Sequence, residues 1–357
     1  MAESWMSEKS NLATRRRVLR GAAMASGAAA LLRKAQAQAP GSAVPTGSAP
    51  ASLPPIPPAV AAALNNKDAW KHLFPPGFRN ERIKTSGAEI NTVIGGSGPP
   101  VLLFHGAPQS LITWRLIAPD LAKEYTLVLC DLRGYGDSSR PAGGGDHADY
   151  SKRPMALDGV EVMKHLGYSQ FRMVGHDRGG RVGRRMALDH PDKVTKLAVL
   201  DIVPAHYLYS HVTLDFVRAY FHWFNDLRAQ PGPENEIKAA ADAQLARATN
   251  EIQIEYLRNN VDMASVHAMC EDYRASASID LKIDEADIKA GKKIQCPLLV
   301  LWAATGAMGK MFDTPAMLSI WREEGVNVTG KGLPGNHSLQ ESAPKETLAE
   351  LQQFLRG

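Results

Sequence analysis

Apolar residues in this chain gather in short, nearly continuous runs, separated by longer stretches in which apolar and polar positions recur with a helical repeat. A strand that is buried on both faces has such a continuous run, because neither face meets water. The clearest runs predict strands over residues 101–104, 125–130, 171–174, 197–200 and 297–301. Strands that alternate with helices predict an α/β fold, in which helices cover both faces of a mainly parallel sheet.

This alternation is interrupted between about residues 204 and 293. The interrupting segment is polar and helical in its spacing, with scattered aromatic residues, and the next strand follows only after Cys296. We therefore expect one domain over residues 66–357 with an inserted helical lid at about 204–293. Residues 38–65 are rich in Pro and Ala and are expected to form an extended or disordered linker.

Residues 1–37 have the order of features that is typical of a twin-arginine export signal. Arginines at 15–17 precede a weakly apolar run over 21–32, and small residues follow up to Ala37. The run is shorter than the roughly 20 residues that cross a bilayer. The pattern predicts cleavage after Ala37 and a periplasmic or secreted protein with no stable membrane association, whereas an irregular basic tail is the alternative.

The positive charge of the chain is concentrated in this N-terminal segment. The whole chain has 41 basic and 37 acidic residues, a formal charge of +4. Seven basic and two acidic residues lie within 1–37, which leaves 34 basic against 35 acidic residues, a net charge of −1. The body therefore lacks the basic surface that nucleic acid requires. Its three cysteines, Cys130, Cys270 and Cys296, lack the spacing of a zinc site and are expected to be buried thiols.

The predicted strand at 171–174 leads into the sequence Gly-His-Asp-Arg-Gly at 175–179, and a helical stretch follows. Glycines on both sides permit a tight strand-to-helix turn, which presents the residue at its tip beyond the carboxyl edge of the sheet. The motif therefore predicts Asp177 as a nucleophile. A plain turn with Asp177 as the N-cap of the helix is the alternative.

A carboxylate nucleophile indicates which bond is broken. Attack by Asp177 on an sp³ carbon displaces a leaving group and leaves an alkyl ester, which water must then hydrolyse. This hydrolysis needs a general base and an oxyanion site. His337, in the loop at 332–338 before the last helical stretch, has the position expected of the base. The backbone amides of Ala107 and Arg178 are expected to form the oxyanion site.

The carboxylate that orients the base can follow either of two predicted strands, 297–301 or 197–200. The loop at 302–308, after the predicted strand at 297–301, contains no carboxylate. The strand at 197–200, in contrast, is followed directly by Asp201. Asp201 is therefore expected to orient His337 and to stabilise its imidazolium form. A helix cap or a loop aspartate is the alternative.

Arg178 and Arg181 lie three residues apart in the first helical turn after Asp177, so they share one face. Cations at this end oppose the helix dipole by roughly 0.3 to 1 kcal/mol each. An anionic substrate accounts for them, because a pair of guanidinium groups can bind its carboxylate and offset its repulsion from Asp177. Salt bridging, the alternative, suits Arg184 and Arg185 better.

From about Leu73 to the C-terminus the chain resembles the fluoroacetate (haloacetate) dehalogenases. The segments that carry the resemblance are Gly-His-Asp-Arg-Gly-Gly-Arg at 175–181, Leu-Asp-Ile at 200–202, His-Trp at 222–223 and Cys-Glu-Asp-Tyr-Arg-Ala at 270–275. The resemblance implies an α/β-hydrolase fold and the roles given above to the two aspartates, the histidine and the arginine pair. It alone implies that halide is bound by His222, Trp223 and Tyr273. Aromatic packing in the lid is the alternative for these three residues.

The chain departs from that family at Ala107, where an aromatic residue is frequent, and at Ser338, where a larger apolar residue is common. The lid between residues 231 and 267 also matches poorly. These departures leave the preferred acid and halogen open.

The expected activity is hydrolysis of a small haloacid such as fluoroacetate or chloroacetate to the hydroxy acid and halide. We expect a small-molecule substrate and neither a metal nor a cofactor; the sequence does not determine the oligomeric state, and a homodimer is compatible with it. An epoxide hydrolase is the alternative, with the same nucleophile and base and a proton donor among the lid tyrosines Tyr207, Tyr209, Tyr220 and Tyr273. A receptor without catalysis would not need nucleophile, base and acid in register.

Overall fold

The computed structural model describes residues 58–64, 66 and 68–356. The expected signal peptide and residues 38–57 of the expected linker lie outside the described residues. The end of that linker is not extended, because Pro58–Leu64 forms helix α2. Its sequence consists mainly of alanine and leucine, which are strong helix formers. Val60 packs against Leu245 and Leu257 of the lid region, and this burial stabilises the helix.

The described residues form an eight-stranded sheet in the order β1-β2-β4-β3-β5-β6-β7-β8. The strands are β1 (Arg79–Lys84), β2 (Glu89–Gly95), β3 (Pro100–Phe104), β4 (Thr126–Cys130), β5 (Phe171–His176), β6 (Val194–Leu200), β7 (Leu298–Ala303) and β8 (Val328–Leu333). Strand β2 runs antiparallel to both of its neighbours, and all other pairs are parallel. The five predicted strands correspond to β3 to β7, so the predicted fold class is confirmed.

Helices cover both faces of the sheet. On one face lie α4 (Lys152–His165), α5 (Arg178–Asp189) and α14 (Thr314–Glu324), and on the other lie α3 (Ala118–Leu121) and α16 (Pro344–Arg356). Successive strand residues point to opposite faces, so Leu102 belongs to the first apolar cluster and Leu103 to the second. The central strands are therefore buried on both sides.

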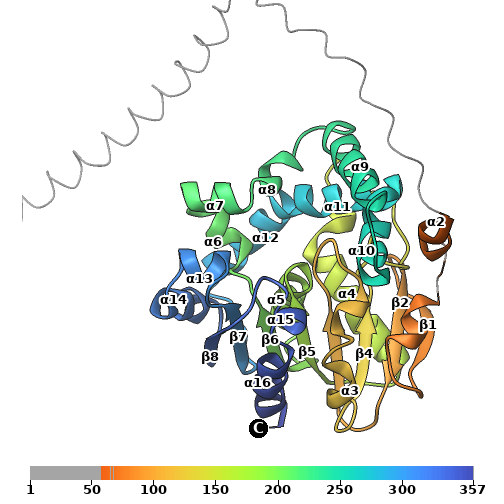
Figure 1. Ribbon diagram of the computed structural model, residues 1–357. Helices are drawn as coiled ribbons and strands as arrows, with labels where there is room; N and C mark the ends of the chain where they lie inside the picture. The colour runs from red at the N-terminus through yellow and green to blue at the C-terminus, as the bar shows by residue number, and fades with distance from the viewer. Residues whose placement is uncertain (1–57, 65, 67, 357) are drawn as a thin grey trace, which may run out of the picture. The chain divides into compact units, whose positions relative to one another are not determined.

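Between β6 and β7 the chain forms a helical insert, which Figure 1 shows above the carboxyl ends of the strands. Its helices are α6 (Ala205–Ser210), α7 (Leu214–Ala219), α8 (His222–Asn225), α9 (Gly232–Leu245), α10 (Glu251–Val261), α11 (Met263–Ser276) and α12 (Ile279–Lys289). The remaining short elements are η1 (Ala69–His72), η2 (Leu111–Trp114), η3 (Ala148–Tyr150), α13 (Ala307–Met311) and α15 (Leu339–Ser342).

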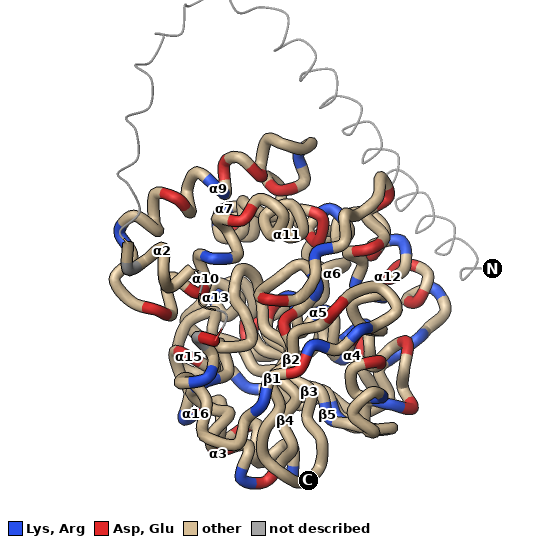
Figure 2. The backbone as a smooth tube through the Cα atoms, turned by 90° about the vertical axis from the view of Figure 1, so that its right-hand side faces the viewer, with Lys and Arg blue, Asp and Glu red and all other residues tan. Residues whose placement is uncertain are grey.

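Basic and acidic positions are intermixed along the backbone on the side that Figure 2 shows. None of the helices in the described part of the chain combines the length and apolar character of a membrane span. Cys130 and Cys270 are buried free thiols, as predicted, whereas Cys296 is partly exposed. Cys296 lies just before β7, where the chain enters the sheet from the surface, so its side chain is not fully covered.

Candidate active site

Asp177 occupies the turn between β5 and α5 with backbone angles of φ 45° and ψ −114°. The turn is tight enough to exclude side chains from both flanking glycines. A Cβ atom on Gly175 would lie 2.4 Å from the carbonyl oxygen of Gly179, and one on Gly179 would lie 2.4 Å from that of Phe104. The Gly-x-Asp-x-Gly pattern is therefore a steric requirement of this turn.

His337 lies in the loop between β8 and α15, close to both aspartates. Its Nδ1 lies 2.6 Å from Oδ2 of Asp201, and its Nε2 lies 4.0 Å from Oδ1 of Asp177. The other carboxylate oxygen of Asp201 accepts a hydrogen bond of 2.8 Å from the amide of Ala303. Asp201 is thus held at the end of β6 by one bond from β7 and one to the histidine.

The charges around the site favour an ionised Asp177. Burial opposes ionisation, but His337, Arg178 and Arg181 hold the pKa of Asp177 well below its usual value. Burial also opposes protonation of His337, but the hydrogen bond to Asp201 and the two nearby carboxylates outweigh it and raise the pKa of His337. A raised pKa makes this imidazole a stronger base than a free histidine.

His176, the residue before Asp177, also contacts His337, and the sequence alone did not predict this contact. Its Nε2 lies 2.9 Å from the carbonyl oxygen of His337. Burial lowers the pKa of His176 to about 3, so the ring is neutral and donates this bond. The one sequence feature that could have indicated this role of His176 is its position inside the Gly-His-Asp-Arg-Gly sequence. His176 therefore anchors the loop that carries His337.

The loop after β3 brings a backbone donor to Asp177. The amide of Ala107 donates a hydrogen bond of 3.0 Å to Oδ2 of Asp177. Nε2 of His105 accepts from the amide of Leu132 at 3.0 Å, so its Nδ1 carries the proton and donates to the carbonyl of Gly106 at 2.8 Å. His105 fixes the shape of this loop, and burial keeps it neutral by lowering its pKa to about 4.

A cavity of about 490 Å³ opens between Asp177 and the helical insert. Its lining includes the following residues named in the sequence analysis: Ala107, Asp177, Tyr220, His222, Trp223, Tyr273 and His337. The lining extends away from the nucleophile to side chains of α8, α9 and α10 such as Asn225, Glu236 and Asn260. The expected nucleophile and base thus line the same cavity as His222, Trp223 and Tyr273, the three residues that the family resemblance selected.

Arg178 and Arg181 are buried beside Asp177 but do not line this cavity. The Arg178 guanidinium lies over the ring of Tyr273, 3.7 Å from its centre, and that of Arg181 lies over Trp223 at 4.6 Å. Nη1 of Arg181 donates to the carbonyl of Val203 at 2.8 Å. Burial lowers the pKa of Arg181 to about 10, so it remains a cation at neutral pH.

The next two arginines of α5 have a different environment. Arg184 bonds to Asp284 at 2.8 Å and to Glu324 at 2.7 Å, and Arg185 bonds to Asp284 at 2.5 Å and Asp189 at 3.1 Å. Both are buried, but their charges are matched by carboxylates. Arg178 and Arg181, the pair closer to Asp177, are less fully matched, because Nε and Nη2 of Arg178 and Nε of Arg181 have no hydrogen-bond partner among the described residues.

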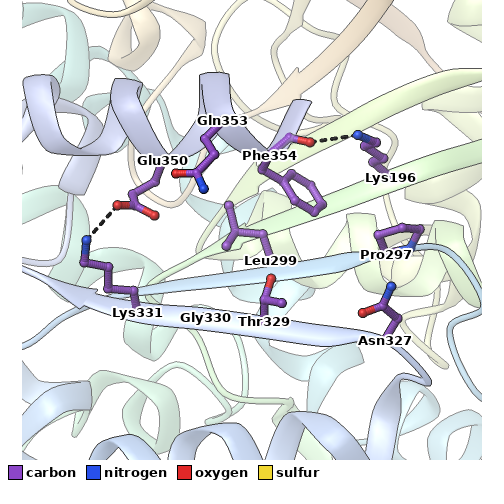
Figure 3. A pocket seen from close by; sticks show the side chains of 10 residues that line it. All are labelled: Lys196, Pro297, Leu299, Asn327, Thr329, Gly330, Lys331, Glu350, Gln353 and Phe354. Atoms are coloured by element: carbon purple, nitrogen blue, oxygen red, sulfur yellow. Dashed lines mark hydrogen bonds and ion pairs between the residues drawn. The ribbon is translucent and has the colours of Figure 1, made fainter. Parts of the chain in front are cut away.

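A second cavity, of about 460 Å³, lies at the opposite end of the strands, between the sheet and α16 (Figure 3). Its charged groups are paired with other protein atoms. Lys331 bonds to Glu350 at 2.8 Å, and Lys196 bonds to the carbonyl of Phe354 at 2.8 Å. The side chains drawn there include no histidine, cysteine or serine. This cavity lacks the groups for the chemistry expected of Asp177.

Metal chemistry has no candidate site in the part of the chain that the structure describes. Its histidine, cysteine, aspartate and glutamate side chains form no group of three or more that could hold a metal ion.

The sequence and the fold were compared with those of known proteins. The model of the alpha/beta hydrolase fold family matches residues 99–322. A fluoroacetate dehalogenase from Burkholderia sp. is 43% identical over 291 residues, which cover 78% of this chain and 94% of that protein. A soluble epoxide hydrolase from Corynebacterium sp. (strain C12) is 31% identical over 275 residues, 73% of this chain and 91% of that protein.

Among solved structures, a putative alpha/beta hydrolase from Nostoc sp. PCC 7120 superimposes with a TM-score of 0.74 at 47% identity, over 78% of this chain and 98% of that chain. The match therefore extends over most of this chain and nearly the whole of that chain. Together with the tight strand-to-helix turn at Asp177, these similarities establish that the chain belongs to the α/β-hydrolase superfamily and, within it, to the fluoroacetate (haloacetate) dehalogenase family.

Proposed function

We propose that this protein hydrolyses the carbon–halogen bond of a small haloacid, such as fluoroacetate or chloroacetate, to the hydroxy acid and halide. The observation that carries the proposal is that Asp177 and His337 line one cavity and that Asp201 is bonded to the ring of His337. An aspartate at this turn suits displacement at an sp³ carbon, for which a serine would be a poor choice. The 43% identity to a fluoroacetate dehalogenase supports the same chemistry.

In the first step a carboxylate oxygen of Asp177 attacks the α-carbon, and the halide leaves with the bonding electron pair. His222, Trp223 and Tyr273 line the cavity on the insert side and are the proposed halide donors. Burial lowers the pKa of His222, so its ring is neutral and offers one N–H donor. Each donor aimed at the developing anion contributes roughly 3 kcal/mol to the transition state.

In the second step water hydrolyses the resulting ester at the carboxyl carbon of Asp177. His337 takes a proton from the water and returns it to the departing hydroxy-acid oxygen, while Asp201 stabilises the imidazolium. The amide of Ala107, already bonded to Oδ2 of Asp177, is the proposed oxyanion donor together with the amide of Arg178. The free carboxylate is restored, and the overall reaction releases one halide and one proton.

Arg178 and Arg181 are proposed to bind the substrate carboxylate. What supports this is that each has a buried N–H group without a partner, and such a group costs free energy until a ligand satisfies it. The Tyr273 and Trp223 rings lie against the guanidinium groups of Arg178 and Arg181, so we expect a carboxylate to approach the guanidinium edges that the rings leave open. Guanidinium edges are also where bidentate bonds to carboxylates form.

Epoxide hydrolysis is a second candidate function, because two of the tyrosines considered for it, Tyr220 and Tyr273, line the cavity. Burial is the main cause that raises the pKa of both phenols, which keeps them protonated and able to donate to an epoxide oxygen. The similarity to a soluble epoxide hydrolase is compatible with this function. The lower identity and the buried arginine pair favour the haloacid.

The deciding experiment measures halide release from fluoroacetate and chloroacetate, and in parallel diol formation from a neutral epoxide, with 1-chlorobutane as a halide without a carboxylate. Preferential release of halide from the haloacids supports the proposed function. Efficient opening of the epoxide with no halide release from either acid would replace it with epoxide hydrolysis.

We also propose that residues 1–37 direct export through the twin-arginine route. Support comes from the order of the arginines, the apolar run and the small residues before Ala37. The full chain would be expressed beside a variant in which Arg16 and Arg17 are changed to lysine, and each would be fractionated. Periplasmic wild-type protein that begins at Gln38, with cytoplasmic retention of the variant, supports export; equal retention of both proteins would reject it.

A further inference from the structure

Helix α11 holds the guanidinium of Arg178 on several sides. Oδ2 of Asp272 lies 3.3 Å from Nε of Arg178, and Oγ of Ser276 accepts a hydrogen bond of 3.1 Å from Nη1. The ring of Tyr273 covers the guanidinium plane at 3.7 Å. Three residues of one helix therefore contact this group. Among the described residues neither Nε nor Nη2 has a hydrogen-bond partner, and Nε has the ion pair with Asp272.

Asp272 is itself fixed by two further groups. It is completely buried, with an exposed fraction of 0%. Its Oδ2 accepts a hydrogen bond of 2.8 Å from the hydroxyl of Tyr135, and its Oδ1 forms an ion pair with Nζ of Lys152. Lys152 belongs to α4, which packs against α5 and the sheet. The position of Asp272 is thus determined by the α/β core as well as by the helical insert.

The charges in this buried cluster make Asp272 an anion. Burial alone would raise its pKa, but Arg178 and Lys152 outweigh burial and lower the pKa of Asp272. Burial alone would likewise lower the pKa of Arg178, and the charge of Asp272 is the largest influence that reverses this. A buried guanidinium without a fixed anion would be costly and free to adopt other orientations.

We propose that Asp272 is a positioning residue for substrate binding, which holds Arg178 so that its Nη2 edge stays directed to the substrate carboxylate. This inference rests on the proposed function, because it assigns a role to the support of the carboxylate clamp. It also explains why an acidic residue stands directly before Tyr273 in the helix. Tyr273 faces the cavity, and Asp272 reaches the arginine beneath it.

The test compares Asp272→Asn with Glu271→Gln as a matched control. Glu271 is the neighbouring residue of α11, is also buried, and is bonded to Arg274 at 2.9 Å and His147 at 2.7 Å. Both variants lose one buried negative charge from the same helix. Only Asp272 contacts Arg178 through its carboxylate, so only Asp272→Asn should affect binding of a carboxylate.

The measurements are kcat and KM for chloroacetate and the inhibition constant of glycolate, the hydroxy-acid product. Asp272→Asn should raise KM and the glycolate inhibition constant by at least about tenfold, with a smaller change in kcat. Glu271→Gln should leave both within about twofold. Asp272→Glu, which keeps the negative charge, should recover part of the lost affinity.

A second variant separates positioning from stability. Asp272→Asn removes the ion-pair partner of Arg178 and one of the two carboxylates that pair with Lys152, the other being Asp280, which destabilises the fold. Combined with Lys152→Met, it restores the net charge of the cluster, so the thermal midpoint should recover whereas glycolate affinity should not. Recovery of glycolate affinity together with stability would overturn the proposal, because Asp272 would then have only a structural role.

Arg178→Lys supplies the coupling measurement. If Asp272 acts through Arg178, adding Asp272→Asn to Arg178→Lys should weaken glycolate binding no further than Arg178→Lys alone. Additive losses would overturn the proposal, as would a folded Asp272→Asn protein that binds glycolate like Glu271→Gln. Absence of halide release from the wild-type protein would instead reject the proposed function itself, so the two failures are distinguishable.

Discussion

Nε2 of His337 lies 4.0 Å from Oδ1 of Asp177, which is beyond the length of a direct hydrogen bond. The opposite nitrogen of the ring is held 2.6 Å from Asp201, so the ring cannot turn away without losing that bond. The carboxylate of Asp177 therefore forms no direct hydrogen bond with His337 and can act as a nucleophile. After esterification the same spacing would place a water molecule within reach of both Nε2 and the carboxyl carbon.

Replacing Asp177 with asparagine should reduce halide release at least a thousandfold, because the amide cannot attack carbon. The side chain keeps its size, so the thermal midpoint should change little. Halide electrode measurements and a melting curve test this, with intact mass used to detect deamidation back to aspartate. Sustained halide release from a protein that still carries asparagine would show that Asp177 is not the nucleophile.

Replacing His337 with asparagine should separate the two chemical steps. Alkylation of Asp177 does not need the base, whereas hydrolysis of the ester does. Incubation with chloroacetate should then produce one equivalent of halide and a protein heavier by one carboxymethyl group in place of a proton. Peptide mapping should locate the added mass on Asp177. Catalytic halide release with no change in mass would exclude His337 as the base.

The pH dependence of turnover should depend on Asp201. His337 accepts a proton only when neutral, so kcat should fall as the pH drops below the pKa of His337, which is raised above that of a free histidine. Asp201→Asn removes the carboxylate that raises this pKa. The acidic limb should move to lower pH, and the plateau should fall by about 10²- to 10⁴-fold. If the acidic limb of the pH profile of kcat stays in place in Asp201→Asn, another group must be the one that titrates.

Changing Arg178 or Arg181 to lysine keeps the charge but removes the planar fork. For chloroacetate, kcat/KM should fall by about tenfold to a thousandfold, which corresponds to roughly 1.4 to 4 kcal/mol of transition-state stabilisation. Arg185→Lys is the matched control, because Arg185 is buried in the same helix but pairs with protein carboxylates. Equal losses in all three variants would argue against a specific clamp.

The central strands could be predicted because a strand buried on both faces has a local signature. Residues 101–104 and 297–301 are continuous apolar runs, and they match β3 and β7 within a few residues. Strands β1, β2 and β8 were not among the predicted strands. Strands β1 and β8 form the edges of the sheet, and most of their side chains are exposed or partly exposed. Strand β2 is buried, but its sequence mixes polar residues such as Asn91 and Thr92 with apolar ones, so it has no continuous apolar run. An edge strand depends on its neighbour for pairing and needs no apolar run.

The turn at Asp177 can likewise be predicted from its neighbouring residues. Its glycines are required because side chains there would clash with backbone atoms a few positions away and in β3. The sequence therefore determined the fold class and the residue at the tip of the turn. It could not determine that Nδ1 of His337 and Oδ2 of Asp201, 136 positions apart in the sequence, are 2.6 Å from each other, although the place of Asp201 after a predicted strand and that of His337 before the last helical stretch suggested it.

Only the tertiary structure decided the partners of the buried charges. Nothing in the local sequence of Arg178 indicates Asp272 in α11 or, behind it, Lys152 in α4. These pairings depend on how the helical insert packs on the sheet, because a buried charge must find its counterion wherever the fold brings one. The local sequence indicates backbone shape and burial, whereas the pairing of the buried charges around the site depends on how the whole molecule packs.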